Sequence, residues 1–222
     1  IDTCRKYNIR VYAGVVINHI TGGGNDMYDD HRSGNSEQCT HWGPKTGSAG
    51  SPYWTVSNRY ENNSYTGKRP VLEYPSIPYF PSDFHCKRDI EDWFDIDQLV
   101  NGWLAGMADV NIEKDYVQQR IADFFTELQS LGMSGISIAN GKQMLPESIA
   151  KIFKKLKENF GGALPKDFLG VIQIQYGNQK DITMCDDESR LSYGIPFKEK
   201  LEELGFSEEE ITQIKIWNTD FL

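Results

Sequence analysis

Apolar residues follow a strand-like pattern in four short stretches of the chain. Residues 9–17 form a nearly continuous apolar run rich in valine and isoleucine, which is typical of a strand buried on both faces, as in a parallel sheet. Residues 135–138, 168–174 and 214–217 form shorter runs of the same kind. The pattern therefore predicts three buried strands and a fourth near the end of the sequence.

Between these strands, apolar residues recur at the spacing of an amphipathic helix. Residues 115–131 are predicted to form a helix that Gly132 ends, and residues 147–160 a helix that Gly161 ends. The predicted buried face of the first helix consists of Val117, Ile121, Phe124, Phe125, Leu128 and Leu131. That of the second consists of Ile149, Ile152, Phe153, Leu156 and Phe160.

A short helix is predicted at residues 196–204, and Ser207-Glu-Glu-Glu210 is a capping box that opens a further helical turn. Strands and helices thus alternate, which favours parallel β-α units. That alternation by itself fits either a closed barrel or a doubly wound sheet.

Residues 21–108 differ from the rest of the chain. Glycine and proline punctuate this stretch, tyrosine and tryptophan are interleaved with them, and no helical or strand period persists. A structureless segment of this length is unusual inside a compact domain unless it is a functional insertion. We therefore expect three regions, at residues 1–20, 21–108 and 109–222.

Composition narrows the possible functions. The chain has 222 residues, of which 39% are hydrophobic, and this fits one or two globular domains. Its formal net charge of −9 argues against nucleic-acid binding, because phosphate contacts require a basic face. No apolar run reaches the length of a membrane span. Because Ile1 is not a natural start, we expect a processed or partial chain.

One stretch resembles a catalytic strand of the α-amylases, glycoside hydrolase family 13. Gly135-Ile-Ser-Ile-Ala139-Asn-Gly-Lys142-Gln143 is similar to the family pattern G-x-R-x-D-x-x-K-H, in which the Asp is the nucleophile and the Arg keeps it ionised. Ser137 stands at the Arg place, Ala139 at the Asp place and Gln143 at the His place. Lys142 matches the pattern.

Further stretches resemble the same family in the same order. Residues 11–19 are similar to the third barrel strand, D-x-x-x-N-H, with Asn18 and His19 matching and Gly14 in place of the Asp. Residues 72–79 and 83–85 resemble the irregular excursion called domain B, and residues 106–117 resemble the segment that returns from it. In residues 167–173, which resemble the fifth strand, Gln173 occupies the place of the acid Glu.

The resemblance implies a partial (β/α)8 TIM barrel of the α-amylase type, with a domain B insertion at 21–108 after the third strand. Sites of such barrels lie at the C-terminal ends of the strands. The family's first two strands would precede Ile1, and its N-H-D motif on the seventh strand would fall beyond Leu222. We expect that the four strand-and-helix units here belong to a larger chain.

A retaining glycosidase needs two carboxyl groups, a nucleophile and a general acid/base, about 5–5.5 Å apart. Neither Ala139 nor Gln173 can fill these roles, since a methyl group cannot attack the anomeric carbon and an amide cannot deliver a proton. The positions resembling catalytic residues, Ala139, Gln173 and Ser137, are therefore all degenerate. We expect no intact catalytic set.

The resemblance also implies binding residues. His19, Lys142 and Trp93 match sugar-contacting positions, and the alternative for His19 is a structural group at a strand end. Asn18, Asp109 and the carbonyl of Gln143 match calcium ligands, and oxygen donors suit that hard cation. The alternative is that Asn18 merely ends a strand and Asp109 begins a turn.

Cys39 and Cys86 both lie in the loop-rich segment, where a disulfide would stabilise a region with little core. We leave open whether they pair or whether all four cysteines, which include Cys4 and Cys185, are free thiols. Asn62-Asn-Ser64 is a glycosylation sequon. We expect a secreted or lumenal protein.

Three functions remain open at this point. The first is an inactive α-amylase homologue that keeps the fold and binds α-glucan or oligosaccharide. The second is a structural or assembly component whose amylase-like fold binds other proteins or the remainder of a longer chain. The third is an active α-amylase that uses other carboxylates, for example Asp83 or Asp109.

Overall fold

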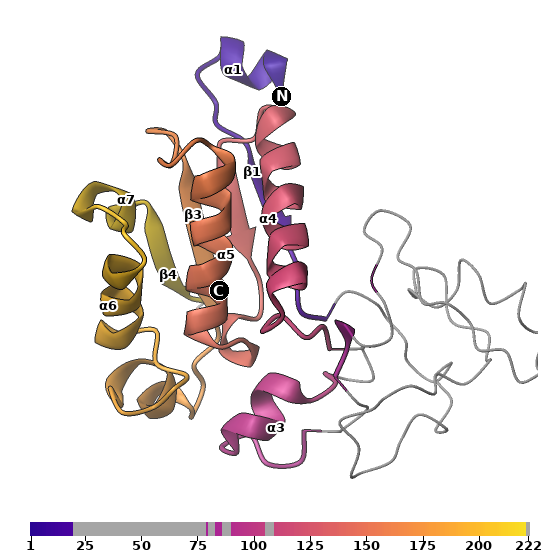
Figure 1. Cartoon of the computed structure of the whole chain (residues 1–222), viewed down its shortest axis with the longest axis vertical. Coiled ribbons are helices and arrows are strands. Elements are labelled where there is room, and N and C mark those ends of the chain that lie inside the picture. The colour runs from indigo at the N-terminus through magenta and orange to yellow at the C-terminus, as the bar shows by residue number, and fades with distance from the viewer. Residues whose placement is uncertain (20–78, 80–82, 86–89, 105–108, 221–222) are drawn as a thin grey trace, which may run out of the picture. The chain divides into compact units, whose positions relative to one another are not determined.

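The structure is a computed structural model, and it describes residues 1–19, 79, 83–85, 90–104 and 109–220 (Figure 1). The chain divides into two compact units. Unit 1 comprises Ile1–Ile17 and Gln118–Leu222, and unit 2 comprises Asn18–Val117. Whether Cys39 pairs with Cys86 stays open, because Cys39, Cys86 and the sequon lie outside the described residues, within which Cys4 and Cys185 are free thiols.

Unit 1 is built on a four-stranded parallel sheet in the order β1-β2-β3-β4. The strands are β1 (Tyr12–Val15), β2 (Gly135–Ile138), β3 (Leu169–Ile174) and β4 (Ile214–Asn218). The predicted adjacent parallel strands are confirmed, although β1 is shorter than the apolar run that contains it. A barrel has eight such strands, and four of them are present here.

The two faces of the sheet differ in burial because side chains alternate along a strand. The face that carries Ile136, Ile138, Ile172 and Ile174 is fully buried, and α4 and α5 cover the sheet from one side in Figure 1. The alternate residues are less buried: Tyr12 is 38% exposed and Trp217 46% exposed. The core of unit 1 therefore lies between the sheet and its helices.

The predicted helices are confirmed as α4 (Asp115–Ser130), α5 (Pro146–Asn159), α6 (Ile195–Glu203) and α7 (Glu208–Thr212). Ser207 and Glu210 form the predicted capping box of α7. The expected burial of Leu131 is wrong: α4 ends at Ser130, and Leu131 is 61% exposed. Gly132 has a φ of 100°, so the chain leaves the helical path beside Leu131.

A buried ion pair joins α5 to α7. Lys157 Nζ lies 2.6 Å from Glu210 Oε2 and also donates to the carbonyl of Gly205 at 2.7 Å. Glu210 in turn accepts from the backbone N–H groups of Leu164 and Ser207. Burial alone raises the pKa of Glu210, but these hydrogen bonds outweigh it and hold that pKa at about 2. One carboxylate thus connects α5, the following loop and α7.

Unit 2 contains a helix that the sequence pattern did not predict. Helix α3 (Ile96–Asn101) begins at Asp95, whose side chain accepts from the backbone N–H groups of Asp97 and Gln98. Six residues are too few for a periodic apolar pattern to be recognised, and only Leu99 and Val100 are buried. Unit 1 has three further short elements, α1 (Asp2–Lys6), the 3₁₀ turn η5 (Gly141–Gln143) and the π-helical turn η6 (Asp181–Cys185).

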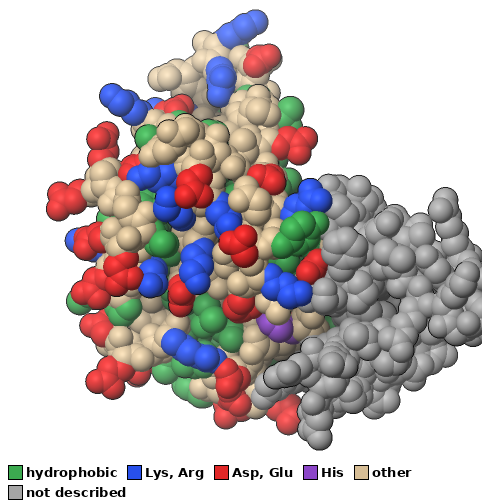
Figure 2. All heavy atoms as spheres, viewed as in Figure 1, with side chains coloured by type: hydrophobic (Ala, Val, Ile, Leu, Met, Phe, Trp, Pro, Cys, Tyr) green, Lys and Arg blue, Asp and Glu red, His purple; other side chains and the backbone are tan. Residues whose placement is uncertain are grey.

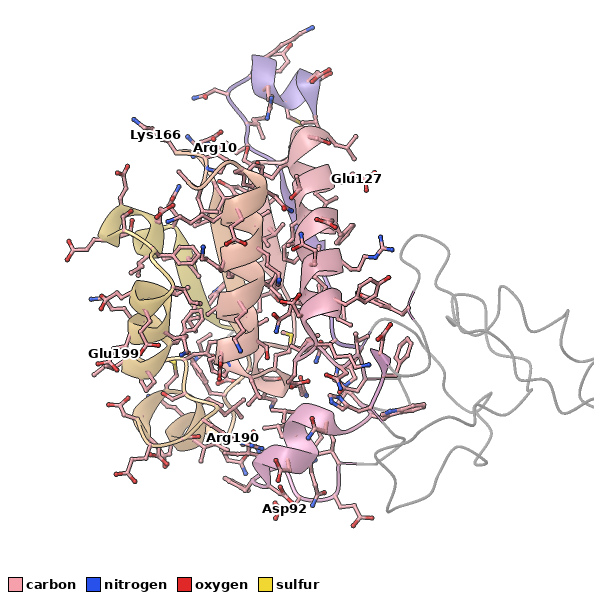
Figure 3. All side chains as sticks on the ribbon, viewed as in Figure 1. Arg10, Asp92, Glu127, Lys166, Arg190 and Glu199 are labelled. Atoms are coloured by element: carbon pink, nitrogen blue, oxygen red, sulfur yellow. The ribbon has the colours of Figure 1, made fainter. Side chains whose placement is uncertain are left out.

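The described surface carries charges of both signs, interspersed on the face that Figure 2 shows. Glu127 on α4, Lys166 before β3 and Glu199 on α6 are exposed and point away from the sheet (Figure 3). None of the described helices combines the length and hydrophobicity needed to cross a bilayer. Two groups of polar side chains, one half-buried in unit 1 and one buried in unit 2, mark candidate sites.

Candidate functional site

The first site lies where β2 and β3 run side by side in unit 1. Gln173 on β3 donates from Nε2 to Ser137 Oγ on β2 over 2.7 Å. Parallel pairing aligns Ser137 with Val171 and places Gln173 one pleat further toward the C-terminal end, on the same face of the sheet. Both side chains are half-buried. The two positions that resemble the Arg and the acid of the family therefore hold a neutral pair that satisfies itself.

The neighbouring degenerate positions leave space at this edge. Ala139 directly follows β2, and its N–H donates to the carbonyl of Val15 on β1. On β1, a Cβ added at Gly14 would meet nothing within 4 Å. The positions that resemble two aspartates of the family thus present a methyl group and a hydrogen atom.

Lys142 lies just beyond the end of β2, in η5. Asn140 adopts a left-handed conformation with φ of 59°, and Gly141 packs so closely on β3 that a Cβ would come within 2.6 Å of Ile172 Cγ2. This turn directs the Lys142 ammonium to Gln179 Oε1 at 3.3 Å. Burial lowers the pKa of Lys142, whereas the Asp220 carboxylate opposes that shift.

Asp220 is a residue that the sequence analysis missed. It follows β4, and its two carboxylate oxygens each lie 3.1 Å from the N–H of Gly177 after β3. Burial and the charge of Asp220 both raise the pKa of the neighbouring Tyr176. No motif in the sequence analysis pointed to Asp220, which lies two residues after Asn218, the last residue of β4.

The C-terminal edge of the sheet in unit 1 therefore offers a hydroxyl, an amide, an ammonium and one carboxylate. This set can exchange hydrogen bonds with a polyhydroxylated ligand. It supplies no carboxyl group at the positions that resemble the nucleophile and the acid, where Ala139 and Gln173 stand.

The second site lies in unit 2, around Asp109. His19 and Asp109 form an isolated antiparallel bridge, and the N–H of Val110 donates to the carbonyl of Asn18 over 2.7 Å. Asn18 and Asp109 are each 1% exposed. Asn18 and Asp109 are 91 positions apart in the sequence. The backbone pairing therefore brings these two predicted ligands into one buried cluster.

Both histidines of this cluster touch the Asp109 carboxylate. His19 Nε2 lies 3.2 Å from Oδ1 but hydrogen-bonds the carbonyl of Gly102 at 3.0 Å. Because a carbonyl only accepts, Nε2 carries the proton and is directed away from Asp109. His85 Nδ1 lies 2.6 Å from the other oxygen, Oδ2. Burial lowers the pKa of both imidazoles, that of His85 to about 4, and the charge of Lys114 adds to the effect on His85.

The cluster has the donor chemistry of a hard-cation site. Within the described part of the chain, Asn18 Oδ1 and Asp109 Oδ1 are buried without a hydrogen-bond partner. Burial and the negative charge of Glu113 raise the pKa of Asp109. A buried carboxylate in such surroundings is costly unless a cation compensates it. The residues present therefore fit an oxygen-coordinated cation.

The other predicted site residues are placed as follows. Gln143 belongs to unit 1, where its side chain is buried and Oε1 has no partner among the described residues. Trp93 is half-buried in unit 2, and the adjacent Phe94 is 53% exposed. The imidazole of His19 is 0% exposed, which favours the structural alternative for this residue. No group of three or more His, Cys, Asp or Glu residues suited to a metal occurs among the described residues.

Comparison with known proteins gives relatives of one kind. The chain is 30% identical to human alpha-amylase 2B over 188 residues, which cover 81% of this chain and 31% of that protein. It is 32% identical to an α-amylase of Thermomonospora curvata over 176 residues, 78% of this chain and 24% of that protein. Mouse pancreatic alpha-amylase 2a5 is 30% identical over 159 residues, 70% of this chain and 25% of its own length. No protein-family model matches.

The fold leads to the same group. Wild-type α-amylase I of Eisenia fetida superposes with a TM-score of 0.53 at 24% identity, over 80% of this chain and 31% of that enzyme. A mutant of that enzyme in complex with maltohexaose superposes with the same TM-score over 78% of this chain. The parallel sheet and its helices are therefore part of a barrel of the α-amylase type.

The fold and the sequence relatives thus point to one group of proteins. The chain belongs to the α-amylases of glycoside hydrolase family 13. It spans about a quarter to a third of the length of these relatives, 25% of the mouse enzyme and 31% of the human one.

Proposed function

We propose that this chain is a catalytically inactive α-amylase homologue that retains binding of α-glucan or oligosaccharide. The observation that carries the proposal is the hydrogen bond between Gln173 and Ser137. At the place of an acid and its cationic neighbour, two neutral groups satisfy each other. Proton transfer by a positioned acid contributes about 10²–10⁴-fold to a rate, and the covalent route also requires the nucleophile that Ala139 lacks.

Retained binding is supported by polar groups that persist at the same strand ends. Lys142 is held by η5 at the sheet edge, with Gln179 and Asp220 nearby. Ammonium, amide and carboxylate groups all hydrogen-bond sugar hydroxyls. In unit 2, Trp93 is proposed separately as an aromatic surface for the apolar face of a sugar ring. Maltohexaose, which the Eisenia fetida enzyme mutant binds, indicates the class of ligand to test.

The test is calorimetric titration of the full chain with maltohexaose, using cellohexaose as the β-linked control. Replacing Lys142 with Met removes the ammonium but keeps the length of the side chain, and K166M is a matched control because Lys166 is exposed in a loop. We expect the wild type and K166M to bind the α-linked sugar alike, and K142M to bind it about tenfold more weakly, as expected for a lost charged hydrogen bond of about 1.5 kcal/mol. Equal binding of both sugars would contradict the proposal.

We further propose that the cluster around Asp109 binds calcium. Asn18 Oδ1 and Asp109 Oδ1, which both belong to unit 2, would supply two of the oxygens. A bound calcium ion would compensate the negative charge of the buried Asp109 carboxylate. The fit is supported by the two orphaned oxygens of Asn18 and Asp109. Residues 21–108 are proposed to form a domain B insertion.

A second candidate function is supported by the less buried face of the sheet. Tyr12 and Trp217 lie on the less buried face of the edge strands β1 and β4, whereas parallel sheets are ordinarily covered on both faces. This favours a scaffold that binds the remainder of a longer chain or another protein. Two results together would favour this candidate: failure of the maltohexaose titration, and self-association in light scattering that Tyr12→Ser abolishes.

A secreted or lumenal location is also proposed. Two relatives are named pancreatic α-amylases, those of mouse and rat, and Asn62 heads a glycosylation sequon. Expression in a eukaryotic secretory host tests it: a mass that falls on treatment with an N-glycosidase, and that does not fall for N62Q, is the expected result.

A further inference from the structure

His85 is held firmly next to Asp109 by its own backbone. Its N–H donates to the carbonyl of Asp109 over 2.9 Å, and its carbonyl accepts from Trp103 Nε1 over 3.0 Å. Trp103 is 1% exposed, so this indole is a fixed donor. The adjacent bridge between Phe84 and Val110 continues the pairing. The backbone of His85, which carries the imidazole, is therefore fixed relative to Asp109.

The imidazole engages one oxygen of the carboxylate and leaves the other. His85 Nδ1 lies 2.6 Å from Asp109 Oδ2, whereas Asp109 Oδ1 has no hydrogen-bond partner in the described part of unit 2. When Asp109 is ionised, as cation binding requires, its carboxylate only accepts, and His85 Nδ1 is then the donor. On its other side, His85 Nε2 lies 3.5 Å from Glu113 Oε2, which is beyond good hydrogen-bond distance. The contact fixes the rotation of the carboxylate about its Cβ–Cγ bond.

We propose that His85 is a positioning residue for a divalent cation: its Nδ1–H holds Asp109 Oδ2, so that Oδ1 stays directed at the cation together with Asn18 Oδ1. This role rests on the calcium site proposed above. Partners that hydrogen-bond a ligating carboxylate set its orientation, and their loss typically costs about 10–100-fold in metal affinity. Asn18 and His19 supply no such contact to Oδ2, which makes His85 the described residue that orients this carboxylate.

The experiment compares two amide substitutions by calcium titration calorimetry on the full chain. In H85N the amide Nδ2 occupies the same branch position as the imidazole Nδ1 and can donate to Asp109. In H85Q the amide nitrogen lies one bond further along and cannot. We expect H85N to bind calcium within about threefold of the wild type, and H85Q and H85A to bind it about 10–100-fold more weakly. The melting temperature of each variant in chelator measures stability apart from calcium.

Each outcome decides between the proposals. If the wild type binds no calcium, the calcium site and the role of His85 both fall. If the wild type and H85Q bind calcium equally, the role of His85 falls and the site stands. If H85N is weakened as much as H85Q, the contribution of His85 lies in packing of the ring, and the positioning role is overturned. H85N and H85Q keep a polar side chain of similar size, so the comparison does not depend on whether H85A folds.

Discussion

Gln173 Nε2 donates to Ser137 Oγ over 2.7 Å across the neighbouring strands β3 and β2. An Arg and a carboxylate at these places would each carry a charge and need the other for compensation. The Gln173 amide and the Ser137 hydroxyl need no charge compensation, because both groups are neutral and hydrogen-bond each other. The degenerate site is therefore a self-consistent arrangement and not a charged site with one member missing.

The first prediction is that the chain does not hydrolyse starch or maltooligosaccharide. Restoring turnover should require A139D and Q173E together, since either one alone leaves one carboxyl at the two places. It should also require S137R, because a bare aspartate beside a glutamate tends to share a proton. The measurement is reducing-sugar release by the wild type, the single variants and the triple variant. Turnover by contaminant-free wild type would show that other carboxylates catalyse.

The second prediction concerns calcium and stability. If Asp109 and Asn18 hold the cation, calcium at about 100 times its dissociation constant should stabilise the folded chain by about 2.7 kcal/mol. D109N keeps the size of the side chain but removes its charge, so calcium should no longer raise its melting temperature. D97N is the control, because Asp97 is exposed in α3. A calcium response of D109N equal to that of the wild type would contradict the assignment.

The third prediction concerns the ion pair between Lys157 and Glu210, whose side chains are 11% and 10% exposed. Removing one partner of a buried pair typically costs about 3–5 kcal/mol, so K157M should lower the free energy of unfolding by about that much. K154M is the matched control on the same helix, because its pair with Glu158 is more exposed and should contribute at most about 0.5 kcal/mol. Urea denaturation at neutral pH measures both values.

The fourth prediction gives the pH dependence of the same contact. The folded-state pKa of Glu210 is about 2, below its ordinary value of 4.5. A depressed pKa means that the ionised carboxylate contributes stability above about pH 4.5 and that this contribution is lost as the pH falls toward 2. The wild type and E210Q should therefore differ most at neutral pH and converge on acidification. A difference that is constant between pH 6 and about pH 2.5 would contradict the assignment.

The fifth prediction separates two glycines at the same sheet edge. An added Cβ at Gly141 would lie 2.6 Å from Ile172 Cγ2 and 3.0 Å from the carbonyl of Gln173, whereas one at Gly14 would meet nothing within 4 Å. G141A should therefore lower the free energy of unfolding by about 1–3 kcal/mol, as overpacking does, and G14A should be neutral. G141A should also weaken maltohexaose binding because η5 positions Lys142. Equal free energies of unfolding for the two variants would contradict the prediction, because they would mean that η5 shifts to accommodate the added methyl group without destabilising the fold.

The sequence by itself determined the order and kind of the elements in unit 1. Periodicity is a local property, so the apolar runs and helical stripes identified β1 to β4 and α4 to α7 without knowledge of their partners. The family motifs, carried by residues such as Lys142 and Ala139, selected the barrel over a doubly wound sheet. The pattern did not predict α3, which is too short to show a period. It wrongly predicted that Leu131 is buried, because the chain leaves the helix at that residue.

Only the tertiary structure decided which side chains meet. That Gln173 contacts Ser137 depends on the register of two parallel strands joined by a long crossover, and register is a property of the pair. Asp220 reaches Gly177 through the pairing of β4 with β3. His85 lies in a stretch with no period, and its contact with Asp109 follows from two backbone bridges and a buried indole. Such contacts form when distant segments pack, and local sequence patterns carry no record of them.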